Sequence, residues 1–242
     1  MLLMSRELHQ ALHNGHIVQK PADPSLISVN SIDVAVGSEG WIMGAHHDVC
    51  ETSELAKSVL KSEGAMIRNL YVGAQDLQGR AQALTAINRS TVRKLRAELS
   101  DWVAPTDVPD DTEVLLLKTG ESYLLSTLHE IGTKPQRTPD DPVLVPVMKA
   151  KSTAGRLGLT VSLCAGVGDY GYHSRWALEC RVAATAKPTL VPLVVGTVIA
   201  QVMFFQGTQS GMDSSSYGGS GSYQETPGQA RFLPKALKVV KY

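Results

Sequence analysis

The second half of the chain alternates apolar and polar residues in short runs. Six such runs follow Glu113, each rich in Val, Leu or aromatic residues, and Gly or Pro turns separate most of them. This spacing is typical of β-sandwiches and β-barrels. We therefore predict strands over residues 114–117, 123–128, 143–147, 159–164, 176–182 and 194–205.

The apolar run from Leu190 to Phe205 is compatible either with a membrane-spanning helix or with strands. It contains Pro192 and Gln201 and is shorter than the roughly 20 residues that a bilayer-spanning helix needs. Two buried strands joined by a turn at Val195-Gly196 account for it better.

A short helix is predicted at residues 5–15. Leu8 and Leu12 lie one turn apart there, Ser5 can cap the first turn and Gly15 can end the last one.

A segment with a different pattern of apolar residues precedes the predicted strands. Residues 81–102 place apolar side chains mostly at helical spacing, in a stretch rich in Arg and Lys, and predict the best helix of the chain. Further along, residues 207–228 are rich in Gly, Ser and Gln, and we expect them to be mobile until a ligand or partner orders them.

Composition and charge narrow the class of protein. The 242 residues suffice for one large domain, and Lys plus Arg equal Asp plus Glu at 23 each, so the formal net charge is zero. General nucleic-acid or anionic-membrane binders usually carry a net positive surface, so both classes are disfavoured. Cys50, Cys164 and Cys180 are an odd number with long gaps, and no secretory signal is visible at the start; both observations favour a reducing, cytoplasmic location.

The first candidate site is the turn 151–159, with the sequence Lys-Ser-Thr-Ala-Gly-Arg-Leu-Gly-Leu. Its hydroxyls and backbone N–H groups can cradle phosphate oxygens while Lys151 and Arg156 neutralise charge. The same residues also suit an ordinary polar turn before a strand, and residue types alone leave both interpretations open.

The second candidate site follows it. Asp169 lies in a turn flanked by glycines, where a carboxylate can meet a ligand hydroxyl. Glu179 lies inside the run Trp-Ala-Leu-Glu-Cys, and if that strand alternates it shares a face with Ala177. A half-buried carboxylate there would suit proton transfer. The alternative, which spacing alone favours, is an outward glutamate on a half-exposed strand or one paired with a nearby Arg.

A metal interpretation of His46, His47 and Asp48 is less favoured than a polar loop. Adjacent residues of an extended chain point to opposite faces, and no second ligand pair has matching spacing. The zinc nucleobase-deaminase signature, His-x-Glu with a later Pro-Cys-x-x-Cys, is absent, as are the Walker, Gly-x-Ser-x-Gly and His-Glu-x-x-His motifs.

Several ordered segments match the motifs of one family. Residues 151–159 are similar to an Arg-Ser-Ser-x-x-Arg-Leu-Gly-Leu motif, Glu179 follows Asp169 at the family spacing of ten residues, and residues 196–201 are similar to a Gly-x-x-Ile-Ala-Gln strand. Residues 217–224 are similar to its C-terminal lid. Together these segments resemble the dCTP deaminase branch of the dUTPase-like superfamily. Weaker similarities extend the match to about residues 1–50 and 111–225.

The resemblance implies a mainly β fold, a distorted jelly-roll or β-barrel of dUTPase-like type with an N-terminal helix. It implies a single domain over residues 1–242, with a helical insertion at about 51–110 and a flexible C-terminal lid at about 207–242. It also implies a homotrimer with active sites at subunit interfaces and no nucleic-acid or membrane partner.

The activity implied is zinc-independent hydrolytic deamination of dCTP, or of a related deoxycytidine nucleotide, to dUTP and ammonia, with Mg²⁺ carried by the nucleotide phosphates. Glu179 would be the general base that activates water for attack on C4, while Ser152 and Arg156 would position the water and stabilise developing charge. The residues implied to bind substrate are Lys151, Thr153, Asp169, Tyr172, Ala177, Tyr217, Tyr223 and Gln224.

Departures from the family pattern leave alternatives open. Lys151 stands where Arg is usual, Ser222 where the lid has Lys, and Ser174 where Gly is usual. Residues 165–172 are also close to the dUTPase motif, whose Asp activates water for pyrophosphate release. The main alternative is therefore a bifunctional dCTP deaminase–dUTPase or a dUTPase-like pyrophosphatase. A catalytically inactive, nucleotide-binding regulatory homologue is the second.

Overall fold

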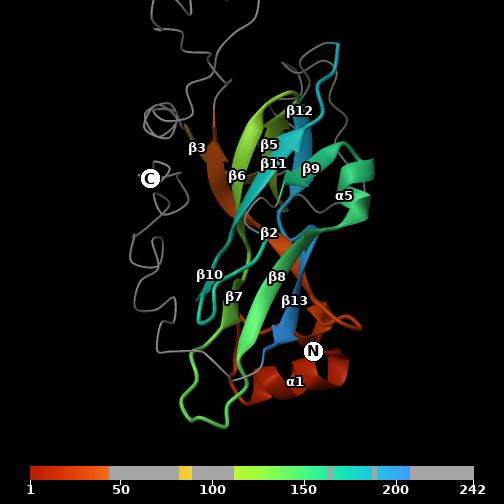
Figure 1. Ribbon diagram of the computed structural model, residues 1–242. Helices are drawn as coiled ribbons and strands as arrows, with labels where there is room; N and C mark the ends of the chain where they lie inside the picture. Colours follow the sequence, from red (N-terminus) through yellow and green to blue (C-terminus); the bar gives the residue numbers. More distant parts are fainter. Residues whose placement is uncertain (44–81, 89–111, 163–165, 187–189, 208–242) are drawn as a thin grey trace, which may run out of the picture.

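The computed structural model describes residues 1–43, 82–88, 112–162, 166–186 and 190–207. Within these ranges the chain is mainly β. Figure 1 shows an elongated arrangement in which α1 lies across one end and the short α5 lies beside the sheet in the other half. No helix in these ranges is long and apolar enough to cross a membrane.

A seven-stranded antiparallel sheet forms the body, in the order β8-β13-β2-β6-β11-β9 with β3 also paired to β2. Strand β2 joins the two halves, because its first residues pair with β13 and its last residues pair with β6 and β3. The pairing of β2 with β6 shifts register between Val36 and Gly40. A Cβ at Gly40 would lie 2.3 Å from the carbonyl oxygen of Leu124, so only glycine permits this close approach. The strands are β2 (Ile32–Ile42), β3 (Gln82–Thr85), β6 (Ser122–Thr127), β8 (Leu144–Ala150), β9 (Leu159–Ser162), β11 (Ala177–Val182) and β13 (Val198–Gln206).

Two three-stranded sheets complete the described fold. One has the order β1-β7-β10 and lies toward α1, and the other has the order β12-β5-β4 and lies at the far end (Figure 1). Their strands are β1 (Ile17–Lys20), β7 (Glu130–Thr133), β10 (His173–Ser174), β12 (Leu190–Val194), β5 (Glu113–Lys118) and β4 (Ile87–Asn88).

Helix α1 (Ser5–His13) is amphipathic and buries Leu8 and Ala11 against the sheet. Its N-cap position is Met4, whose N–H donates to the Glu7 carboxylate over 3.0 Å, so the prediction of Ser5 as the cap was wrong. Gly15 follows the helix with φ +74°, as predicted for its end. The 3₁₀ helix η1 (Pro24–Leu26) and α5 (Ser152–Arg156) are the other helices among the described residues.

The core follows from the alternation along the strands. Strands β8, β9 and β11 send alternate side chains inward, and the fully enclosed side chains come from both halves of the long sheet and from α1. They include Leu8, Ile32, Leu125, Leu178 and Phe204, each at 0% exposure.

Strands form within each of the six predicted ranges, although residues 163 and 164 lie outside the described residues and the turn at Val195-Gly196 divides the range 194–205. Strand β12, predicted as buried, is half-buried along its length. The helix predicted over residues 81–102 is wrong at residues 82–88. There the chain forms β3 and β4, which pair with β2 and β5. Pairing with an open strand edge outweighed the helical spacing of the apolar residues, as tertiary context commonly does. Residues 51–81 and 89–110 of the predicted insertion lie outside the described residues.

Candidate active site

The turn predicted to bind an anion forms the short helix α5. Ser152 and Arg156 stand four positions apart, so they share one face of it, and both are exposed, as is Thr153. Ala154 is buried and anchors the helix. The structure therefore gathers two hydroxyls and a guanidinium at the surface.

Helix α5 lies at the Val182 end of β11. Gly158 has φ +83°, which turns the chain from α5 into β9, and its carbonyl accepts the N–H of Ala183 over 2.8 Å. Leu159 then pairs with Val182. These contacts fix the helix against the edge of the sheet.

Lys151, which directly precedes α5, is held by the body of the protein. Its ammonium lies 2.6 Å from Asp33 Oδ1, and its N–H donates to the carbonyl of Ile199 over 2.9 Å. That carboxylate oxygen is enclosed and accepts no hydrogen bond among the described residues, so the lysine supplies its counter-charge. The pair contributes at most about 1 kcal/mol to stability, because both side chains are about a quarter exposed. Its clearer effect is to fix the start of α5.

Asp169 is exposed in a tight turn between β9 and β10. The N–H of Tyr172 donates to the Asp169 carbonyl over 3.0 Å, and Gly171 adopts φ +82°. The N–H of Gly171 donates to Thr133 Oγ1 over 3.1 Å, which ties the turn to β7. The Asp169 carboxylate is thus carried on a backbone that β7 holds in place.

Tyr172 packs edge-on against Trp176, with ring centroids 5.1 Å apart at 89°. The indole N–H of Trp176 donates to the Ile131 carbonyl over 2.8 Å, and the Tyr172 hydroxyl lies 3.4 Å from the Arg175 carbonyl. Gly168 passes directly over the indole, since a Cβ there would meet it at 2.6 Å. These contacts hold the half-buried Tyr172 ring in one orientation.

Glu179 lies on the exposed face of β11, so the outward glutamate that spacing favoured is confirmed and the hypothesis of a half-buried carboxylate was wrong. The alternation itself is confirmed, because Leu178 and Cys180 point into the core while Ala177 shares the Glu179 face and is half-buried. The register partners of Glu179 are Ser162 and Leu124. The neighbouring outward residues Thr160, Ser162 and Arg181 are exposed as well, which leaves the carboxylate in contact with solvent in the single chain.

The structure does not join α5 to Glu179. Leu159 of β9 pairs with Val182 of β11, and Ser162 pairs with Glu179. These two pairs lie three residues apart, which is about 10 Å along the strand. Among the described residues, no hydrogen bond or ion pair links Glu179 to Ser152 or Arg156.

Several predicted residues lie outside the described ranges. They are Tyr217, Tyr223 and Gln224 of the lid, His46, His47 and Asp48 of the possible metal site, and Cys50 and Cys164.

Sequence reasoning missed two ion pairs that support these segments. Asp33 holds Lys151, and Arg175 Nη1 lies 3.3 Å from Glu39 Oε1, which joins β2 to the segment between Tyr172 and β11. The Ser126 hydroxyl donates to the Glu39 carbonyl over 2.7 Å and fixes the same part of β2. The alternation of Arg175 with Ala177 and Glu179 places it on their face and was the available signal.

Comparison with known proteins gives one consistent family. Residues 67–207 match a family model described as dCTP deaminase-like. A dCTP deaminase of Haloarcula marismortui is 34% identical over 206 residues, which cover 84% of this chain and 80% of that protein.

Two relatives are described as dCTP deaminase, dUMP-forming. That of Leptospira biflexa is 34% identical over 116 residues, 48% of this chain and 57% of the relative. That of Hathewaya histolytica is 39% identical over 67 residues, 28% of this chain and 34% of the relative. This chain therefore matches less than two thirds of the length of these two relatives.

One solved structure, the 2′-deoxycytidine 5′-triphosphate deaminase of Agrobacterium tumefaciens, aligns with a TM-score of 0.49 and 13% identity. The alignment covers 85% of this chain and 48% of that one. The range of the family model includes β3 and β4, which sequence reasoning had placed in the insertion.

Proposed function

The chain belongs to the dCTP deaminase-like family, and from that premise we propose that it removes the 4-amino group of dCTP, or of a related deoxycytidine nucleotide, by hydrolysis. The observation that carries the proposal is the position of Glu179. Its carboxylate projects from the open face of β11, and the Asp169 turn lies at the start of the same stretch of chain.

In the proposed reaction Glu179 acts as general base. It takes a proton from a water molecule, and the resulting hydroxide adds to C4 of the cytosine ring. Glu179 then returns the proton to the amino group, the C4–N bond breaks, and ammonia leaves a uracil ring behind. Water supplies the oxygen atom, so the step needs no oxidant or reductant. A positioned general base of this kind contributes typically 10²–10⁴-fold to the rate.

Ser152 and Arg156 have roles that follow from their shared face on α5. The hydroxyl can hold the attacking water, and the guanidinium can stabilise negative charge that develops in the transition state. Among the described residues neither side chain has a hydrogen bond and Arg156 has no ion pair, so both are available to a ligand.

We place the complete site between copies of the chain. The separation of α5 from Glu179 within one chain supports this, because a neighbouring copy can bring its α5 to the exposed face of β11. The assembly we propose is a homotrimer, in which each of three equivalent interfaces forms one site.

The sugar and phosphates would be held by the remaining residues. Asp169 is proposed to accept the 3′-hydroxyl, and the fixed Tyr172 ring to pack on the sugar and exclude a 2′-hydroxyl. Lys151 and Thr153, with Tyr217, Tyr223 and Gln224 of the lid, are proposed to contact the triphosphate. Mg²⁺ would arrive on the phosphates as part of the substrate.

A second candidate function is deamination followed by release of pyrophosphate. The dUMP-forming relatives favour it, and so does the exposed Asp169, which could activate a second water molecule. The two candidates differ only in whether the product is dUTP or dUMP.

The test is an assay of the purified chain with dCTP and Mg²⁺, in which ammonia is measured and nucleotides are separated by chromatography. We expect ammonia with dUTP or dUMP as product, and Glu179→Gln should lower kcat at least about 10²-fold. The control is Glu113→Gln, the same substitution at an exposed glutamate of β5, which should leave kcat unchanged. Nucleotide binding without ammonia release would instead indicate the inactive homologue.

A further inference from the structure

A cavity of about 380 Å³ opens beside α1, at the end of the molecule away from β9 and α5 (Figure 1). It lies between α1, β1 and η1, and its apolar lining includes Leu12, Ile17 and Ile27. Its size falls within the roughly 300–1,000 Å³ of small-molecule sites. None of the residues proposed for deamination lines it.

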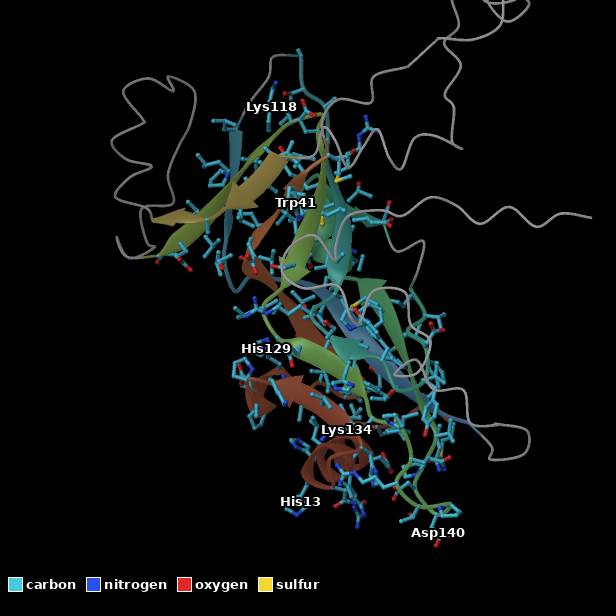
Figure 2. The ribbon with its side chains drawn as sticks, turned by 90° about the vertical axis from the view of Figure 1, so that its left-hand side faces the viewer. His13, Trp41, Lys118, His129, Lys134 and Asp140 are labelled. Carbon is cyan, nitrogen blue, oxygen red and sulfur yellow. The ribbon has the colours of Figure 1, made fainter. Side chains whose placement is uncertain are left out.

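Four basic side chains converge on this cavity. His9 and His13 stand one turn apart on α1, Lys20 ends β1, and Lys134 follows β7. Lys134 is half-buried, and its backbone N–H donates to the His16 carbonyl over 3.0 Å. Figure 2 shows His13 and Lys134 together at the α1 end of the molecule. In the part of the chain that the structure describes, none of the four side chains has an ion pair or hydrogen bond.

No carboxylate is among the described residues that line the cavity. Two carboxylates in neighbouring segments accept hydrogen bonds from residues of their own turns. Asp23 accepts from the N–H and hydroxyl of Ser25, and Asp141 accepts from the N–H groups of Arg137 and Thr138. A third, Glu130, pairs in register with Lys20.

The groups that line the cavity sum to a positive charge, while the Asp23, Asp141 and Glu130 carboxylates carry opposing charge in the segments around it. The C-terminal end of α1 adds a partial charge of about −0.5. The two lysine charges exceed it, and the Arg137 guanidinium adds another positive charge 3.8 Å from where a Gly15 Cβ would lie.

We propose that this cavity binds an organic phosphate, at a site distinct from the deamination site. The phosphate would lie between the Lys20 and Lys134 ammonium groups, and the imidazoles of His9 and His13 would donate hydrogen bonds to it. The apolar side chains would pack against the body of the ligand. The lysines account for the charge of the ligand, and Leu12, Ile17 and Ile27 account for its organic part.

The experiment measures binding to the full chain by isothermal titration calorimetry. AMP is the probe, adenosine is the uncharged control, and inorganic phosphate is the control without an apolar body. We expect saturable binding of AMP, with adenosine and inorganic phosphate each at least about tenfold weaker. The double variant Lys20→Gln/Lys134→Gln should weaken AMP binding about tenfold or more.

Matched controls separate this site from the deamination site. Lys149→Gln, at an exposed lysine of β8 outside the cavity, should leave AMP affinity within about twofold. Selective ¹³C labelling of histidine rings should show His9 and His13 resonances shifting with AMP in wild type and in Glu179→Gln alike. The proposal is overturned if AMP shows no saturable binding, or if the folded double variant binds AMP as tightly as wild type. Neither outcome depends on deaminase activity.

Discussion

At the scale of single residues, His129 is a side chain whose pKa is clearly shifted by the fold. Its side chain is only 7% exposed, and burial lowers the pKa of its imidazole below the ordinary value. The Asp23 carboxylate opposes this effect and the Arg175 guanidinium adds to it, so the direction of the pKa shift is downward. The folded protein therefore holds His129 neutral under conditions in which an unfolded chain would already protonate it.

This shift predicts a loss of stability on mild acidification. As pH falls below about 6.5, the pKa of His129 in the unfolded chain, the unfolded chain binds a proton that the folded chain does not bind. The free energy of unfolding therefore decreases until pH reaches the lower pKa of His129 in the folded chain. Above about pH 7.5 the residue contributes no pH dependence. Urea unfolding between about pH 8 and pH 5.5 should show a smaller slope in His129→Gln than in wild type.

The control for this prediction is His9→Gln, the same substitution at a histidine that is exposed on α1. Its pH slope should match that of wild type. Equal slopes in wild type and His129→Gln would show that another group causes the acid sensitivity.

At the scale of elements, the contact between β7 and β10 holds the Asp169–Tyr172 turn in place. Gly132 of β7 pairs with His173 at φ +156°, and a Cβ there would lie 2.0 Å from the Tyr172 carbonyl oxygen. No rotation of a side chain can relieve that clash, because the backbone fixes the position of the Cβ and its partner is a backbone carbonyl oxygen. An alanine at this position must therefore push the Tyr172 turn away from β7.

Gly132→Ala should lower the free energy of unfolding by on the order of 3 kcal/mol. It should also raise KM for dCTP, since Tyr172 moves with the turn. Gly155→Ala is the matched control: this glycine lies inside α5, and a Cβ there meets nothing within 4 Å. That substitution should raise the free energy of unfolding by about 0.5–1 kcal/mol. Urea unfolding of both variants checks the pair, and equal stabilities would contradict it.

The elements also show how far sequence reasoning reaches. Strands such as β9 and β11 were predictable because their alternating residues meet one buried face and one open face. Strands β3 and β4 were predicted as helix, because their pairing partners lie far away in sequence. The short strands β1, β7 and β10 were missed, since each is too short to show a period.

The candidate site was predictable in part for a related reason. Motif spacing identified Ser152, Arg156 and Glu179 as candidates, and periodicity placed Glu179 on the face opposite Leu178. The exposure of the Glu179 side chain could not be predicted, because it depends on whether another element or another copy of the chain covers that face of β11. The partner of Lys151, Asp33, was also hidden, since it lies on a strand more than a hundred residues earlier.

At the scale of the whole molecule, the separation of α5 from Glu179 has a testable consequence. If each site takes Arg156 from one copy and Glu179 from its neighbour, the variants Arg156→Gln and Glu179→Gln are each inactive alone. A mixed assembly contains sites in which both residues are intact. With random mixing at equal amounts, about a quarter of all sites are of that kind, and in the mixed trimers alone about a third are.

Co-expression of the two variants with different affinity tags, followed by purification through both tags, should therefore restore measurable deamination of dCTP. Size-exclusion chromatography with light scattering should give about 78 kDa, three times the 26.0 kDa of one chain. The control is a mixture of Glu179→Gln with the double variant Arg156→Gln/Glu179→Gln, which has no intact Glu179 and should stay inactive. If the doubly tagged mixture of single variants is also inactive while wild type is active, both residues act within one chain, and α5 must then reach Glu179 by a rearrangement of about 10 Å along β9.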